Sequence, residues 1–226
     1  MLRVFIGYDE RETAAFHVLA HSILSRASRP VSIIPLAKRH LPEYTRPRAA
    51  NESTDFSLTR FMVPYLCGYE GYAVFMDLDM LCLADIWELM GRDWSKDPKA
   101  VWVCKHDYTP KSATKFLGNE QTTYRCKNWS SLMVFNNAEC RALTPKYVNT
   151  ASGLALHQFF WLGKDGEERV GPLPLAWNWL VGEYPPNPQA KILHYTLGGP
   201  WFEDFIKCDH AQEWYDERAK MLAPAY

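Results

Sequence analysis

An apolar run that ends in two acids constrains this chain more than any other feature. Residues 72–76 (YAVFM) have the composition of a buried strand, and Asp77 and Asp79 follow with one leucine between them. Burying an unpaired carboxylate is costly, so buried acids are usually paired, protonated or bound to metal. Alternation along a strand predicts that both side chains point to one face at its carboxyl end. Open α/β sheets bind their ligands at that edge.

Two oxygen ligands on one face favour a magnesium or manganese ion that holds a phosphate-bearing substrate. The alternative is a strand end at which Asp79 only caps the turn before residues 85–89 (DIWEL). His194 is a further candidate ligand, at the end of the apolar run 191–195 (KILHY). A single histidine more often has a structural role, but its neutral imidazole and two carboxylates form a mixed site suited to Mn²⁺.

Apolar runs alternate with helical patterns along the whole chain. We expect strands over residues 2–6, 31–35, 72–76, 100–104, 131–135 and 191–195. We expect helices over residues 12–24, 57–66, 152–162 and 209–222. This order predicts an α/β fold with a mainly parallel, Rossmann-like sheet flanked by helices. The chain shows no linker or repeat, which indicates a single domain over residues 1–226.

Composition excludes several classes of protein. With 25 basic and 26 acidic residues, the net charge of -1 offers no electrostatic argument for nucleic acid. No apolar run is long enough to span a membrane, although peripheral membrane contact stays open. Residues 2–6 are too short and too soon charged for a signal peptide. The six scattered cysteines lack CxxC spacing and indicate reduced thiols. We therefore expect a soluble, cytoplasmic protein.

Three blocks of sequence carry a family resemblance. They are residues 4–9 (VFIGYD), residues 59–61 (TRF) ahead of 75–79 (FMDLD), and residues 194–201 (HYTLGGPW). The pattern resembles nucleotide-sugar glycosyltransferases of the GT-A fold and is most similar to glycosyltransferase family 8, the group of glycogenin and the lipooligosaccharide galactosyltransferases. The blocks keep that family's order over nearly the whole chain. The resemblance implies a metal-dependent hexosyltransferase that moves a sugar from a UDP-sugar to a hydroxyl of a glycan or glycolipid acceptor, with retention.

The same resemblance implies the residues that hold the diphosphate. Asp77, Asp79 and His194 would bind Mn²⁺ (or Mg²⁺), which bridges the diphosphate of the donor. Leu78 lies between the two acids of this DxD motif. Gly198 and Gly199 would let backbone N–H groups approach a phosphate, although the two glycines equally suit a turn.

The resemblance also implies where the nucleoside lies and which cations reach the phosphates. Tyr8 and Asp9 match positions that stack on the uracil and hydrogen-bond the ribose. Arg60 matches an arginine near the donor sugar. The family usually has a lysine where this chain has Gly199, so Arg60 or Lys191 would have to supply that charge.

The candidate catalytic residues are Gln158 and Arg60, from the resemblance, and Asp107. Gln158 fits the central position of the family's Asp-Gln-Asp motif, but His157 and Phe159 stand in place of the acids. We therefore prefer same-face attack, in which the leaving phosphate takes the acceptor proton. Asp107 is a candidate base should the enzyme invert.

Two other functions fit the sequence. One is a catalytically inactive carbohydrate-binding domain of the same fold, with glycans held by the aromatic segment 177–184. The other is a sugar-1-phosphate nucleotidyltransferase, which would need a glycine-rich loop after the first strand. Residues 7–11 (GYDER) hold a single glycine there, which disfavours it.

Overall fold

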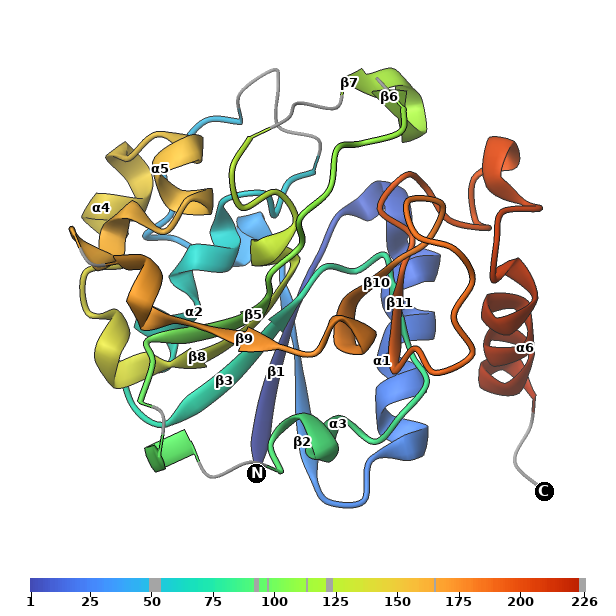
Figure 1. The fold of residues 1–226 in the computed structure, drawn as a ribbon, viewed down its shortest axis with the longest axis horizontal. Helices are drawn as coiled ribbons and strands as arrows, with labels where there is room; N and C mark the ends of the chain where they lie inside the picture. Colours follow the sequence, from blue (N-terminus) through green and yellow to red (C-terminus); the bar gives the residue numbers. More distant parts are fainter. Residues whose placement is uncertain are drawn as a thin grey trace.

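The computed structural model describes residues 1–48, 54–91, 94–96, 98–112, 114–120, 124–164 and 166–223. Among these residues a central sheet has the strand order β2-β1-β3-β8-β5-β9 (Figure 1). Its strands are β1 (Leu2–Gly7), β2 (Val31–Leu36), β3 (Tyr72–Met76), β5 (Val101–Cys104), β8 (Leu132–Asn136) and β9 (Val170–Leu173). Five of the six expected apolar runs form strands of this sheet, and the sixth, 191–195, forms a strand of a smaller sheet; β9 was not expected.

The central sheet is mainly parallel. β1 pairs in parallel with β2 and β3, and β5 pairs in parallel with β9. β8 runs antiparallel between β3 and β5. Ile6 of β1 lies opposite Met76 of β3, so Tyr8 and Asp77 emerge at the same carboxyl edge. The predicted α/β fold is confirmed, and this edge is where such sheets bind ligands.

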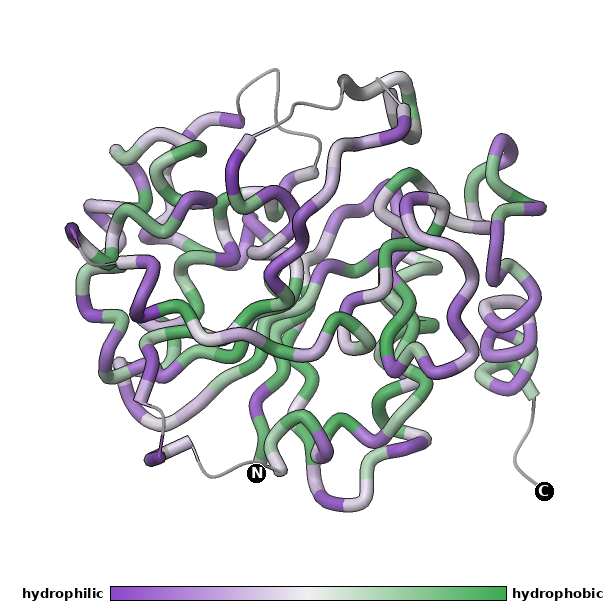
Figure 2. The backbone as a smooth tube through the Cα atoms, viewed as in Figure 1, coloured by the Kyte–Doolittle hydropathy of each residue, from purple (hydrophilic) through white to green (hydrophobic). Residues whose placement is uncertain are grey.

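Helices flank the sheet. The long helix α1 (Thr13–Arg26) lies on one side, and α2, α4 and α5 gather on the other (Figure 1). Their bounds are α2 (Val63–Leu66), α4 (Pro145–Thr150) and α5 (Gly153–His157). Short helix α3 (Ile86–Leu89) follows the DxD region, and α6 (Ala211–Leu222) closes the described chain. Figure 2 shows hydrophobic residues along α1 and the central strands, which form the main core.

A smaller sheet brings His194 beside the DxD turn. It has the order β10-β11-β4, with β4 (Met80–Cys82), β10 (Trp179–Leu180) and β11 (Ile192–His194). β4 and β11 are antiparallel, so His194 pairs with Met80. We had not expected β4 or β10, because strands of two or three residues are too short to show a period.

Away from these sheets a hairpin of β6 (Thr114–Lys115) and β7 (Asn119–Glu120) projects from the polar segment after β5 (Figure 1). None of the described helices has the length and apolar composition that crossing a membrane requires. The single domain over residues 1–226 stays a prediction.

Two expectations about prolines and helices were wrong. β2 extends one residue past the expected range 31–35, so Pro35 lies within the strand and does not end it; β2 is an edge strand, where a missing N–H is tolerated. Residues 57–66 do not form one helix. A 3-10 turn at Thr59–Met62 leads into α2, with Pro64 in the first turn, where its missing N–H is not needed.

The expected helix over residues 152–162 is also interrupted. α5 ends at His157, and Phe159 adopts a left-handed conformation with φ 60° before a further 3-10 turn. Gln158 therefore closes a helix instead of lying inside one.

A buried carboxylate fastens α6 to α1. Glu217 of α6 is 2% exposed and accepts hydrogen bonds from His21 Nδ1 at 2.6 Å and Arg26 Nη2 at 2.7 Å. Burial alone raises the pKa of the Glu217 carboxyl, but hydrogen bonds from Arg26 and His21 outweigh it and hold that pKa below its usual 4.5. The ion pair thus stabilises the packing of the two helices.

We expect Glu217→Gln to lower the free energy of unfolding by about 1–3 kcal/mol at pH 7, because Arg26 loses its anion. Since the folded pKa is depressed, this stabilisation is present above the usual pKa of 4.5 and is lost as the pH falls through the folded value. Urea unfolding at pH 7 and at decreasing pH measures it. Glu213→Gln, on the exposed side of α6, is the control, and equal midpoints for both variants at pH 7 would contradict the expectation.

Candidate metal and nucleotide site

Asp77, Asp79 and His194 converge at the carboxyl edge of the central sheet. A ligand atom from each lies within 4.8 Å of the others, and His194 Nε2 is 3.3 Å from Asp79 Oδ1. The His194 side chain is 2% exposed, and those of Asp77 and Asp79 are 15% and 14% exposed. Two carboxylate oxygens and one imidazole nitrogen are a donor set that fits Mn²⁺ or Mg²⁺.

The two acids converge for a different reason from the one expected. β3 ends at Met76, so strand alternation does not apply, and residues 77–79 form a turn around the fully buried Leu78. The backbone of this turn is held at both ends. Asp77 N donates to Ser131 O at 2.9 Å, and Tyr195 N donates to Asp79 O at 2.8 Å.

Asn178 orients His194. The Asn178 side chain is fully buried, and its Oδ1 lies 2.9 Å from His194 Nδ1. Its Nδ2 donates to Ser131 Oγ at 2.8 Å. Because an amide oxygen only accepts, Nδ1 carries a proton, which leaves Nε2 as the nitrogen able to bind a metal beside Asp79. This tautomer is the one that a metal-binding histidine needs.

Sequence reasoning missed Asn178. We had treated residues 177–184 only as an aromatic segment. The signal available was a lone amide between two tryptophans in an otherwise apolar stretch, since a buried amide needs partners.

Arg60 supplies a cation at the site. It is 5% exposed, its Nη1 lies 2.8 Å from Asp77 Oδ1, and it donates to Ser130 O at 2.9 Å. Its guanidinium also lies 4.9 Å from the centre of the Phe75 ring. Lys191, by contrast, lies just before β11, at the opposite end of that strand from His194, and pairs with Glu88. Of these two cations, Arg60 is the one beside the DxD turn.

Tyr8 and Asp9 follow β1 at the same edge. Tyr8 lines a cavity of about 420 Å³ together with Glu10, Ala37, Lys38, Arg39, Tyr44 and Asp55. Asp9 is buried, and its carboxylate accepts from Arg11 Nε at 2.9 Å and from Asp55 N at 3.2 Å. Burial raises the pKa of Asp9, but these bonds outweigh it and the pKa is lowered. In this structure Asp9 therefore anchors Arg11 and the start of the segment at Asp55.

The two glycines allow a tight turn after His194. Gly198 has φ 137°, and a Cβ there would fall 2.7 Å from the Phe205 ring. A Cβ on Gly199 would fall 2.1 Å from the Trp201 ring. Larger residues would displace these rings, so both glycines are explained by packing. Their contact with a phosphate stays a prediction.

The remaining predicted residues lie around this centre. Gln158 is half-buried at the end of α5, next to His157, whose Nδ1 lies 2.7 Å from Ser130 Oγ. The carbonyl of Ser130 accepts from Arg60, so the end of α5 borders the site. Asp107 is exposed in the loop after β5. The catalytic roles of Gln158 and Asp107 stay predictions.

Glu12 is a buried carboxylate that sequence reasoning missed. It is 2% exposed, and its Oε2 accepts from Trp201 Nε1 at 3.1 Å. Burial raises the pKa of Glu12 from its usual 4.5 to about 8, and the nearby charge of Asp79 adds to the rise. In the sequence Glu12 looks like an ordinary acid at a helix start, and only the fold turns it toward the site.

Comparison with known proteins places the chain in a family. No family model matches it. Over 225 residues it is 44% identical to Protein CDI of Arabidopsis thaliana, and the match covers 95% of this chain and 85% of that protein. The chain belongs to the family of Protein CDI.

Solved structures give the fold type. The bifunctional glycosyltransferase WbbM matches 96% of the chain with a TM-score of 0.66 at 18% identity, and the chain spans 49% of WbbM. An active-site mutant of LgtC matches 99% of the chain and 98% of its own length, with a TM-score of 0.63 at 11% identity. GlyE of Streptococcus pneumoniae has a TM-score of 0.63 at 14% identity, over 99% of this chain and 60% of GlyE. The GT-A fold expected from the resemblance is confirmed.

We expect Asn178→Leu to weaken Mn²⁺ binding about 10- to 100-fold, because His194 loses the partner that fixes its tautomer. Isothermal titration of the variant with Mn²⁺ alone measures the change. Asn137 is equally buried and donates to Glu70 O through its Nδ2, so Asn137→Leu is the matched control. Equal losses in both variants would indicate a general packing effect.

We expect Glu12→Gln to stabilise the metal-free protein at alkaline pH. A raised folded pKa means that the folded state loses stability as the pH rises from 4.5 toward 8, and glutamine avoids this loss. The melting temperature in EDTA at pH 8.5 should rise by at least about 2 °C relative to the native chain, with little difference at pH 5. Glu10→Gln, on the exposed face of the same turn, should change neither value. A gain independent of pH would contradict the assignment.

Proposed function

We propose that this protein is a metal-dependent glycosyltransferase that moves a sugar from a nucleotide diphosphate, a UDP-sugar by resemblance, to a hydroxyl acceptor. The observation that carries the proposal is the cluster of Asp77, Asp79 and His194 at the ligand-binding edge of a GT-A fold. The fully buried Asn178 supports it, because its contact selects the histidine tautomer that binds metal. The resemblance to glycosyltransferase family 8 suggests a glycan or glycolipid as the acceptor. The cytoplasmic location stays a prediction.

The donor nucleoside fits the cavity beside Tyr8. That cavity opens at the carboxyl ends of β1 and β2, the general place for nucleotides in such sheets. The Arg39 guanidinium lies 5.6 Å from the centre of the Tyr8 ring, so an aromatic face and a cation are available to a base and a ribose. The diphosphate would then extend past Leu78 toward Gly198 and Gly199.

The residues of the site have different roles in cleavage of the donor. When bound, a divalent ion held by Asp77, Asp79 and His194 supplies Lewis-acid stabilisation of the departing diphosphate. Arg60 balances the charge of Asp77 and holds the segment at Ser130. Buried surroundings strengthen each of these interactions relative to water.

The proposed stereochemistry is retention. The bond between sugar C1 and the diphosphate oxygen breaks, the bond from the acceptor oxygen to C1 forms on the same face, and the acceptor proton passes to the leaving phosphate. A double displacement would need a carboxylate below the sugar. Gln158 has His157 and Phe159 as its neighbours, so its motif supplies none. Inversion with Asp107 as base is the alternative, and the anomeric configuration of the product distinguishes the two.

We expect UDP to raise the melting temperature only when Mn²⁺ is present, and the rise to disappear in EDTA and in Asp79→Asn. A ligand at a hundredfold excess over its Kd stabilises the folded state by about 2.7 kcal/mol. Differential scanning fluorimetry measures the shift.

Asp85→Asn is the matched control, because Asp85 caps α3 through a bond to Trp87 N and asparagine caps equally well. A full UDP shift in Asp79→Asn would contradict the site. Binding of glycans without any effect of nucleotide or metal would favour the inactive carbohydrate-binding domain.

A further inference from the structure

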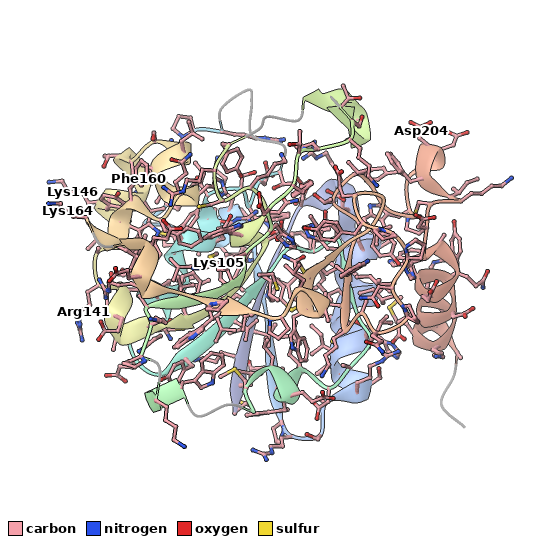
Figure 3. The ribbon with its side chains drawn as sticks, viewed as in Figure 1. Lys105, Arg141, Lys146, Phe160, Lys164 and Asp204 are labelled. Carbon is pink, nitrogen blue, oxygen red and sulfur yellow. The ribbon has the colours of Figure 1, made fainter. Side chains whose placement is uncertain are left out.

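A groove of about 750 Å³ lies between the β6–β7 hairpin and the segment after the glycine turn. We call it the hairpin groove, and its lining residues are Ser112, Thr114, Leu117, Gly118, Leu197 and Phe202–Phe205. Asp204 lies in the 3-10 turn Glu203–Phe205 that precedes α6 (Figure 3). The hairpin groove shares no lining residue with the cavity beside Tyr8, so it is a separate binding space.

One wall of the hairpin groove is close in sequence to the candidate site. Leu197 lies three residues after His194 and directly before Gly198. The Phe205 ring packs so closely on Gly198 that a Cβ there would lie 2.7 Å from it. One wall of the groove is thus built on the turn that follows the metal-binding histidine. The hairpin groove is thus tied through this turn to the metal ligands and is lined by other residues than the cavity beside Tyr8.

The lining has the chemistry that recognises sugar rings. Phe202 and Phe205 are half-buried and offer aromatic faces on which the C–H groups of a sugar can pack. Glu203 and Asp204 are exposed carboxylates that accept hydrogen bonds from hydroxyls. The groove therefore combines apolar faces with acceptors.

The charge of the residues that line the hairpin groove disfavours anionic sugars. None of the described residues that line the hairpin groove is cationic, and two are acidic. The cavity beside Tyr8, in contrast, contains Lys38 and Arg39. Like charges repel at such short range, so a phosphorylated or uronic sugar would meet an unfavourable field in the hairpin groove.

The backbone at the hairpin tip adds an independent observation. Leu117 has φ 56° and is 61% exposed, so a large apolar side chain is held outward in a left-handed conformation. That conformation is unfavourable for a residue with a Cβ atom. Strain of this kind concentrates where a side chain is presented to a ligand.

We propose that the hairpin groove binds the acceptor and that this acceptor is an uncharged glycan. The inference rests on the proposed glycosyl transfer and adds the place and the charge class of the acceptor.

The test compares two groove variants with two matched controls. Leu117→Asp and Asp204→Lys alter the groove, while Leu24→Asp on α1 and Glu168→Lys make the same kinds of change at exposed positions outside its lining. The assay measures UDP release from UDP-glucose and UDP-galactose with Mn²⁺. Its acceptor panel contains neutral p-nitrophenyl hexosides and maltose, with p-nitrophenyl glucuronide and glucose 6-phosphate as anionic members.

We expect neutral glycosides to stimulate UDP release and the anionic members to fail. Both groove variants should raise the KM for the neutral acceptor about tenfold, as loss of one good contact does, and both controls should not. The Mn²⁺-dependent UDP shift in melting temperature should persist in the groove variants.

Three outcomes would overturn the groove assignment while the UDP shift remains. They are an unchanged KM in both groove variants, stimulation by anionic sugars alone, and no stimulation by any member of the panel. If the unmodified protein showed no Mn²⁺-dependent rise in melting temperature with UDP, that result would instead count against the proposed function. The two failures are therefore distinguishable.

Discussion

The antiparallel pairing of β4 with β11 is the interaction on which the candidate site depends. It sets His194 opposite Met80 and lets the Tyr195 amide donate to the Asp79 carbonyl. These contacts join segments more than one hundred residues apart in the chain. Without them the DxD turn would still follow β3, but the imidazole would have no fixed position beside it.

The candidate site gathers more carboxylates than cationic side chains, which favours binding of a metal cation. Asp79 lies close to Asp77 and also acts on the buried Glu12, and Arg60 pairs with Asp77. The pKa of Glu12 is raised because burial and the nearby charge of Asp79 both make its ionised form less favourable. A divalent ion would relieve this cost, so the same residues that weaken the metal-free fold favour binding. Perturbed acids of this kind are typical of functional sites.

Aromatic packing connects the glycine turn to the C-terminal helix. Trp201 donates to Glu12, and its ring centre lies 5.5 Å from that of Trp214 on α6. Tyr215 of the same helix donates to the carbonyl of Pro200 at 3.1 Å. Glu217 then holds α6 on α1. None of the candidate metal ligands lies on α6, yet this helix supports the glycine turn through these contacts.

Much of this arrangement could be read from the sequence. Apolar runs predicted every central strand except β9, whose residues include Gly171 and Pro172, because strands covered on both faces are largely apolar. The acids after residues 72–76 pointed to the ligand edge, and the resemblance carried by the closing block around His194 pointed to the GT-A fold. What failed were short-range details. Pro35 within an edge strand and the broken helix near Gln158 depend on neighbours that a local pattern does not include.

The sequence by itself determined the α/β fold, the edge at which ligands bind and the residue types that can hold a metal. These follow from hydrophobic periodicity and from the cost of burying carboxylates, which are properties of local sequence. Tertiary structure alone decided that Asn178 fixes the tautomer of His194, that Glu12 faces Asp79, and that a second groove opens beside Gly198. Each of these joins residues far apart in the chain through side-chain contacts, and no local period encodes which distant partners will meet.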